Sequence, residues 1–337
     1  MERRTQAILL ISSLINSQEA KYVKPLTVNE YGYFVCWLAM NGFSEEDLLS
    51  SSSIDSMEML WSSASSHYAA KKAVNFYRLD ATIRNIQFER IRDLLKRESN
   101  LSNSLERWQR AGIWILDRHH EHYPSALAER MGHQSPALLF GIGNPELLNK
   151  QAIAFVGSRN RTLNDSEHTQ HYVSQVNRLG FQVVSGGAAG IDIDAMTASL
   201  TNDNSCVGIL ADSLYKAASN PIWQQGLQSN KLALITPQYP ESGFSTANAM
   251  IRNKYIYAMS CAAVVVCSGE KGGTWEGAQQ NLKHGWAPLF VSKHEEPLQL
   301  GNSKLLAYNS KSKLQATPIN AENFSELLMS KISIQLI

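Results

Sequence analysis

The chain has 337 residues, 44% of them hydrophobic and 18% charged, with a formal net charge of +1. This ordinary globular composition leaves room for two domains and for a core that needs no disulfide bonds. It excludes a general electrostatic attraction to nucleic acid, so a nucleic-acid partner would have to be held by a local basic cluster.

The chain begins with basic residues before a short apolar run, MERRTQAILLISSLI. Serines interrupt this run and no cleavage pattern follows it, which favours an amphipathic first helix over a signal peptide. No later segment has the length of a membrane span, and the four cysteines form no CxxC pair. We therefore expect a cytoplasmic protein with free thiols and no membrane association.

Residues 1–103 have apolar residues at helical spacing throughout and are predicted to form a helical N-terminal domain. One predicted helix ends near Gly42, and Ser44 with Asp47 reads as a capped start of the next. ESNLSNS, residues 98–104, is predicted as the linker into an α/β domain over 104–300, with a strand and helix extension over 301–337. Basic residues share one face of the predicted helices before this linker, and we expect a solvated face rather than a nucleic-acid contact: Lys71, Lys72, Arg78, Arg84, Arg90, Arg92, Lys96 and Arg97.

The second region alternates short apolar runs with helical intervals. The predicted strands are AIAFVG, FQVVSG, CVGIL, LALITP, AAVVVCS and PLFVS. Because these runs are almost continuously apolar, both faces of their sheet must be covered. The sequence predicts an α/β fold with a Rossmann-like, doubly wound parallel sheet. The three histidines near residue 120 are predicted to lie in a solvated turn, and no metal site is expected.

In such a sheet ligands collect outside the carboxyl ends of the strands. The residues expected there are glycines, hydroxyls and cations, without a carboxylate pair or a nucleophile set, and this inventory suits phosphate binding. The predicted site consists of Gly157, Ser158, Arg159, Ser185, Gly186, Gly187, Gly190, Arg252, Asn253, Lys254, Gly272, Gly273 and Thr274, with Asp212 and Ser213 after the third strand.

The glycine loops match neither common nucleotide fingerprint. SGGAAG lacks the lysine of a P-loop, and no GxGxxG opens the first helix. A row of such pockets suits a polyanion backbone, whereas a phosphate-and-ribose pocket would suit one nucleotide. Tyr215, Phe244, Tyr255 and Trp275 are predicted near this rim, as stacking platforms or as core residues.

The motifs HYPSAL, SPALLFGIGNPELL, AIAFVGSRN, GFQVVSGGAAGIDIDA, SGFSTANAMIRNKYIYAMS and AVVVCSGEKGGTWEGA follow one another over residues 105–293. In this order they resemble the DNA-processing protein A family, also called DprA or Smf. The resemblance implies a Rossmann-like domain that binds single-stranded DNA through its phosphates, forms a homodimer and delivers the strand to a RecA-type recombinase in natural transformation.

Position by position, Arg159 matches the family's DNA-contacting arginine. Ser185, Gly186 and Gly190 match its phosphate loop, and Asn253 with Lys254 match its RN-R/K pair. Met196, Lys216 and GGTWEGA depart from the pattern, and no C-terminal winged-helix domain is expected. These departures are similar to a divergent subset that includes members associated with phage defence or toxin–antitoxin modules.

Two alternatives stay open at this point. A regulatory module could sense a nucleotide or DNA ends and restrain a partner such as a cognate toxin. A nucleoside monophosphate phosphoribohydrolase would need a differently spaced glutamate, because Glu276 follows Thr274 by two residues instead of three, about 100° around a helix. The preferred reading is a binding protein that is not an enzyme and needs no cofactor.

Overall fold

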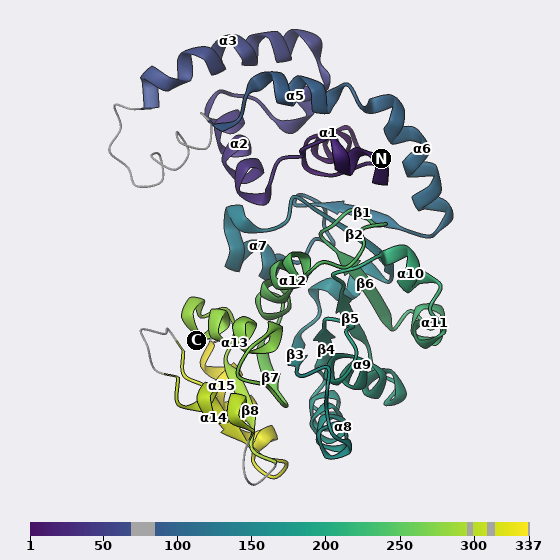
Figure 1. Ribbon diagram of the computed structural model, residues 1–337, viewed down its shortest axis with the longest axis vertical. Coiled ribbons are helices and arrows are strands. Elements are labelled where there is room, and N and C mark those ends of the chain that lie inside the picture. The colour runs from purple at the N-terminus through teal and green to yellow at the C-terminus, as the bar shows by residue number, and fades with distance from the viewer. Residues whose placement is uncertain (69–84, 295–298, 309–313, 336–337) are drawn as a thin grey trace. The chain divides into compact units, whose positions relative to one another are not determined.

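The computed structural model describes residues 1–68, 85–294, 299–308 and 314–335, which form two compact units (Figure 1). The first unit comprises residues 1–123, 131–140 and 237–241, and the second comprises residues 124–130, 141–236 and 242–337.

The first unit is largely helical, as predicted. Its helices, short 3₁₀ turns and first strand are α1 (Arg3–Ser12), η1 (Ser17–Lys21), α2 (Val28–Met40), η2 (Glu45–Leu49), α3 (Ser51–Tyr68), α5 (Phe88–Leu95), α6 (Glu98–Arg110), β1 (Trp114–Asp117) and η3 (Gly132–Gln134). Helix α2 begins with a reciprocal capping box between Thr27 and Glu30. The predicted Ser44–Asp47 capping box is confirmed at the start of η2.

Helix α1 differs from the expected amphipathic helix. Its residues Ala7 to Ile11 are all fully buried, so the AILLI run is enclosed on every side. Five consecutive buried residues cannot occupy one face of a helix, because successive positions rotate by about 100°. The serine-interrupted apolar run is therefore part of the core of the first unit.

The prediction that ESNLSNS forms a linker is wrong. Its residues form the first half of α6, in which Leu101, Ser104 and Trp108 are buried at helical spacing. Trp108 packs at 5.4 Å between ring centroids on Phe140 of the same unit. Packing of this buried face outweighs the weak helix preference of serine and asparagine.

The structure describes four residues of the predicted basic face, and only Lys96, with a side chain 73% exposed, is solvated as expected. Arg90 is paired with Glu30, and Arg92 with Asp55 and Glu58. Arg97 is 8% exposed and pairs with the buried Glu19 at 2.6 Å. Lys71, Lys72, Arg78 and Arg84 lie outside the described residues.

The second unit holds the predicted parallel sheet (Figure 1). Its strands are β3 (Ala152–Val156), β4 (Gln182–Ser185), β5 (Cys206–Ile209), β6 (Leu232–Thr236), β7 (Ala262–Val265), β8 (Leu289–Ser292) and β9 (Thr317–Ile319). They lie in the order β6-β5-β4-β3-β7-β8-β9, and each neighbouring pair is parallel. Residues 141–143, the end of β2 (Leu138–Gly143), continue this row beyond β6. All six predicted strands are confirmed.

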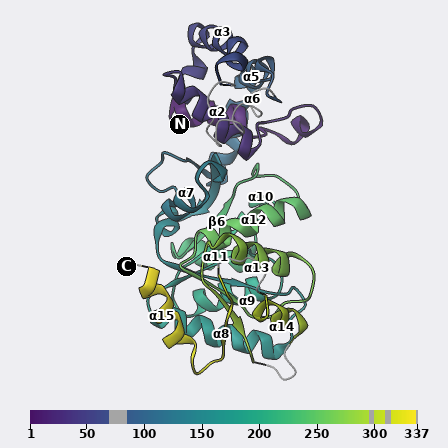
Figure 2. The ribbon, with the colours of Figure 1, turned by 90° about the vertical axis from the view of Figure 1, so that its left-hand side faces the viewer.

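Helices connect the strands and cover the sheet. They are α7 (Ser125–Met131), η4 (Pro145–Asn149), α8 (Leu163–Arg178), α9 (Ile191–Thr201), α10 (Leu214–Ala218), α11 (Pro221–Gln228), α12 (Thr246–Ala258), α13 (Gly273–His284), α14 (Leu300–Leu306) and α15 (Phe324–Gln335). Helix α8 packs on α9, and α12 packs on α13. The last helix, α15, contacts α8 (Figure 2).

The chain order reverses at β3. From β3 the chain moves outward through β4, β5 and β6, and it then crosses back to place β7 on the other side of β3. With right-handed crossovers, the two directions put helices on opposite faces, which makes the sheet doubly wound. The predicted fold class is confirmed. Among the described residues no helix combines the length and the hydropathy that crossing a lipid bilayer requires.

Candidate functional site

The reversal of strand order places a crevice at the carboxyl ends of β3 and β7. Residues 157–159 follow β3, and the loop 266–272 leads from β7 into α13. The backbone N–H of Ser158 donates to the carbonyl of Cys267 at 2.9 Å, and the Thr274 hydroxyl donates to the carbonyl of Gly157 at 2.8 Å. These two bonds fix the loop after β3 against the start of α13.

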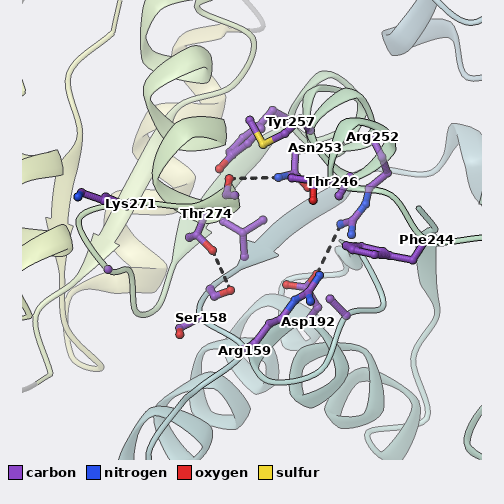
Figure 3. A pocket seen from close by; sticks show the side chains of 17 residues that line it. Ser158, Arg159, Asp192, Phe244, Thr246, Arg252, Asn253, Tyr257, Lys271 and Thr274 are labelled. Carbon is purple, nitrogen blue, oxygen red and sulfur yellow. Dashed lines mark hydrogen bonds and ion pairs between the residues drawn. The ribbon is translucent and has the colours of Figure 1, made fainter. Parts of the chain in front are cut away.

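A pocket of about 400 Å³ opens at this point, and we call it the switch-point pocket (Figure 3). Helix α12, the first turn of α9 and the loops after β3 and β7 supply its walls. Its lining residues are Val156, Gly157, Ser158, Arg159, Ala188, Asp192, Phe244, Thr246, Ala249, Met250, Arg252, Asn253, Tyr257, Gly269, Lys271, Gly273 and Thr274. A second hollow of about 280 Å³, the side hollow, adjoins it and shares Arg159, Ala188, Phe244 and Arg252.

A buried ion pair lies between the two cavities. The Nη1 atom of Arg252 is 3.6 Å from Oδ2 of Asp192, and both side chains are less than a tenth exposed. Burial raises the pKa of Asp192, whereas Arg252 and the backbone N–H groups of Ala188 and Gly186 act in the opposite direction. Burial lowers the pKa of Arg252, Asp192 counteracts this shift, and the nearby charge of Arg159 adds to it.

Two glycines of the SGGAAG loop are required by close packing. A Cβ atom on Gly186 would lie 1.4 Å from Nη1 of Arg252, so only glycine leaves room for that guanidinium. Gly190 has a φ of +92°, and a Cβ atom there would lie 2.3 Å from the carbonyl oxygen of Ser158. These glycines bring α9, α12 and the loop after β3 together.

Two cations on the rim are exposed to solvent. Arg159 has its guanidinium carbon 5.0 Å from the ring centroid of Phe244, and that ring is 52% exposed. Lys271 is exposed on the loop before α13, across the pocket from Phe244 (Figure 3). The pocket lining thus carries three cationic side chains, Arg159, Arg252 and Lys271, against the single carboxylate of Asp192.

Two helices begin at the pocket without a side-chain cap. Gly190 precedes α9 and Gly272 precedes α13, and neither N-cap makes a side-chain hydrogen bond. By contrast, Thr162 and Asp165 form a capping box at the start of α8. At α9 the N–H groups of Ile191 and Ile193 donate to the carbonyls of Ser158 and Ala188, so backbone acceptors largely satisfy this helix start. A helix N-terminus without a side-chain cap, as at α13, presents free N–H groups and a partial positive charge, which favour an anion.

The structure brings most of the predicted site residues together. Gly157, Ser158, Arg159, Arg252, Asn253, Gly273 and Thr274 line the switch-point pocket, and Gly186, Gly187 and Asp212 line the side hollow. Gly190 and Gly272 are the N-caps of α9 and α13.

Three predicted residues have other surroundings. Ser185 is fully buried, and its hydroxyl donates to the carbonyl of Phe155 at 2.6 Å. Ser213 is buried and caps α10. Lys254 is half-buried on α12 and is not a lining residue of either cavity. The MIRNKY motif lies in the middle of α12 and does not open that helix.

The predicted site did not include three pocket residues, Lys271, Asp192 and Tyr257, although all three lie within the motifs of the family resemblance. Lys271 precedes two glycines and a helix start in GEKGGT, which was a usable signal for a cation beside an anion site. Among the four rim aromatics, Phe244 is exposed at the pocket, whereas Tyr255 is 3% exposed and belongs to the core.

A sequence model of the family described as DNA recombination-mediator protein A matches residues 114–323. The chain belongs to this family. The resemblance to DprA proteins that the motifs indicate is therefore confirmed. The DNA processing protein DprA of Bacillus subtilis is 27% identical over 225 residues, which are 66% of this chain and 75% of that protein. The chain spans less than half the length of related proteins from Synechocystis and Mycobacterium tuberculosis.

Two solved structures of the family share the fold. DprA of Streptococcus pneumoniae has a TM-score of 0.56 at 16% identity, covering 78% of this chain and 86% of that one. DNA processing protein A of Helicobacter pylori, whose structure concerns its single-stranded DNA binding mode, has a TM-score of 0.55 at 22% identity. That match covers 65% of this chain and 96% of that one.

Proposed function

We propose that this chain binds single-stranded DNA at the switch-point pocket, without sequence specificity, and handles the strand in recombination. The observation that carries the proposal is the surplus of positive charge in the pocket lining, three cations against one carboxylate, together with the start of α13, which has no side-chain cap. Phosphate is the anion that such donors favour. Two findings support DNA as the molecule that supplies this phosphate: the chain belongs to the DNA recombination-mediator family, and the Helicobacter pylori relative binds single-stranded DNA.

The cations have different roles in this proposal. Arg159 and Lys271 are exposed and can reach a phosphate directly. Arg252 is 5% exposed and paired with Asp192, so it acts mainly by holding α12 against the SGGAAG loop and by adding its charge to the field of the pocket. Loss of Arg252 would change the shape of the site, whereas loss of Arg159 would remove a contact.

The Phe244 ring accounts for the expected preference of the protein for single-stranded over duplex DNA. Its half-exposed ring offers a π-face, and the Arg159 guanidinium covers that ring in the free protein. When Arg159 moves to a phosphate, a base can replace it on the ring. Stacking requires an unpaired base, so duplex DNA would lose this contact.

We further propose that the site binds without catalysis. Glu276, the glutamate nearest to the phosphoribohydrolase pattern, is exposed in the first turn of α13 and is not a lining residue of either cavity. A role in transformation or phage defence, a RecA-type recombinase, a cognate toxin and a homodimer rest on resemblance alone. Pull-downs and light scattering address these partners directly.

The test is a fluorescence-anisotropy titration of a labelled 20-nucleotide oligo-dT strand and of a duplex of equal length. We expect tighter binding of the single strand, and Arg159→Ala should weaken it by about tenfold or more, since hydrogen bonds to charged groups contribute about 1.5–3 kcal/mol.

Arg178→Ala is the matched control, because it removes one exposed arginine from the last residue of α8, about 22 Å along that helix from its first residue, Leu163. This control should change the affinity less than twofold. Equal losses of affinity in Arg159→Ala and Arg178→Ala would show that the DNA-binding site lies elsewhere on the chain.

A further inference from the structure

The inner wall of the switch-point pocket contains polar atoms without a partner. The Tyr257 hydroxyl and Nε of Arg252 are buried and make no hydrogen bond, and both residues line the pocket. Tyr257 is only 1% exposed. Buried polar groups almost always have a hydrogen-bond partner. Two buried donors without a partner beside a cavity therefore indicate that a bound group accepts their hydrogen bonds.

Of the two donors, the one on Tyr257 belongs to a ring that packs on α13, whereas the Arg252 guanidinium lies against Gly186 and Asp192. A Cβ atom on Gly277 of α13 would lie 3.3 Å from Cε2 of Tyr257, and the Asn253 side chain donates to the carbonyl of Gly273 at 3.1 Å. Lys271, Thr274 and Tyr257 line one side of the pocket, across from Phe244 (Figure 3). The unsatisfied N–H groups of the first turn of α13, an ammonium and a hydroxyl therefore surround one end of the cavity.

We propose that this end of the pocket binds a terminal phosphomonoester, the phosphate of a nucleotide that has only one ester bond. The inference rests on the proposed function and specifies its ligand. A monoester carries a charge of about −1.5 to −2 and three terminal oxygens, whereas an internal diester carries one charge and two such oxygens. Donors from three separate elements, with surplus positive charge, match the monoester better.

The size of the two cavities fits this ligand. A volume of about 400 Å³ falls in the ~300–1,000 Å³ range of small-molecule sites and can hold one nucleotide, with its base on Phe244. The side hollow continues from Arg159 and Phe244 and gives the strand a path beyond its last nucleotide. The monoester can belong to the end of a strand or to a free nucleotide, and both sources have the same chemistry.

The experiment compares four forms of one 20-nucleotide oligo-dT strand: with a 5′-phosphate, with a 3′-phosphate, with hydroxyls at both ends, and ligated into a circle. Each competes against an internally labelled circle of the same length in anisotropy measurements. Thymidine, thymidine 5′-monophosphate and thymidine 3′-monophosphate are added as separate competitors.

We expect one phosphorylated linear strand to bind about five- to tenfold tighter than the hydroxyl-ended strand and the circle. In Tyr257→Phe this preference should fall to twofold or less, because the affinity for the phosphorylated strand falls more than the affinity for the circle, and thermal unfolding confirms the fold. Competition by one thymidine monophosphate but not by thymidine would support the same site with a free nucleotide as its source.

Equal binding of all four strands, without competition by either monophosphate, would overturn the inference and leave the proposed function intact. An end preference that Tyr257→Phe does not change would also overturn it. If the wild type bound none of the four strands, the circle included, the proposed function itself would be rejected.

Discussion

Replacement of Gly186 by alanine is expected to disrupt the site through packing. The new Cβ atom would lie 1.4 Å from Nη1 and 2.4 Å from Cζ of Arg252, and 2.5 Å from Oδ2 of Asp192. Arg252 is buried, so its guanidinium can leave this position only by separating from Asp192. Overpacking costs about 1–3 kcal/mol and breaking a buried ion pair about 3–5 kcal/mol, so we expect a loss of roughly 2–4 kcal/mol in the free energy of unfolding.

Urea unfolding of Gly186→Ala measures this loss, with Gly243→Ala as the matched control. A Cβ atom on Gly243 meets nothing within 4 Å, so that variant should stay within about 0.5 kcal/mol of the wild type. The affinity for single-stranded DNA should fall in Gly186→Ala as well, because Gly186 and Arg252 both line the side hollow. Wild-type stability in Gly186→Ala would refute the packing role assigned to this glycine.

Three further predictions concern the second unit and the pH range of the fold. Asp165→Asn should lower the free energy of unfolding by about 2–3 kcal/mol in urea titrations. The buried carboxylate of Asp165 accepts hydrogen bonds from the backbone N–H and the hydroxyl of Thr162, and it lies 2.8 Å from Nε2 of His294. An unchanged free energy of unfolding would contradict the role of these contacts. Burial raises the pKa of Asp165 and of Glu30, but the hydrogen bonds from their partners outweigh it and hold both pKa values below their usual 3.8 and 4.5. Their contribution to stability should therefore be complete above about pH 5, begin to be lost as the pH falls below 4.5 for Glu30 and 3.8 for Asp165, and be gone below the lowered pKa values of the folded protein; a melting temperature that is flat from pH 6 to 3 would exclude it. Phe244→Ala should weaken single-strand binding by about 1–3 kcal/mol while Phe244→Trp preserves it, and equal binding by both variants would remove the stacking contact.

The strands and their sheet could be predicted because each is a short apolar run closed by glycine or by polar residues. Burial on both faces removes any alternation, so the pattern indicates a parallel sheet directly. The N-terminal elements were harder to predict. ESNLSNS becomes helical only because Leu101 and Trp108 face a core that lies far away in the sequence, and the basic face disappears because Arg90, Arg92 and Arg97 meet acidic partners far along the chain.

The sequence indicated where the candidate site lies but not the role of each residue. Glycines and cations at strand ends predicted the edge of the sheet at which the structure has the switch-point pocket. Local sequence could not show that Ser185 turns its hydroxyl to Phe155, or that Arg252 is buried against Asp192, since both contacts join separate elements of the fold. Tyr257 lies within a motif of the family resemblance, but nothing in the sequence gave it a role, and only the assembled pocket shows its unpaired hydroxyl.

The salt dependence of single-strand affinity tests the central claim most directly. If the wild type neutralises about four phosphates, log K should fall with log salt at a slope near −3, and Arg159→Ala should reduce the magnitude of that slope by about 0.7. The affinity of Arg159→Ala should also fall to a similar extent for DNA strands of different base sequence, because phosphate contacts carry no base information. A slope near zero in the wild type, or the same slope and affinity in Arg159→Ala, would contradict phosphate binding at the switch-point pocket.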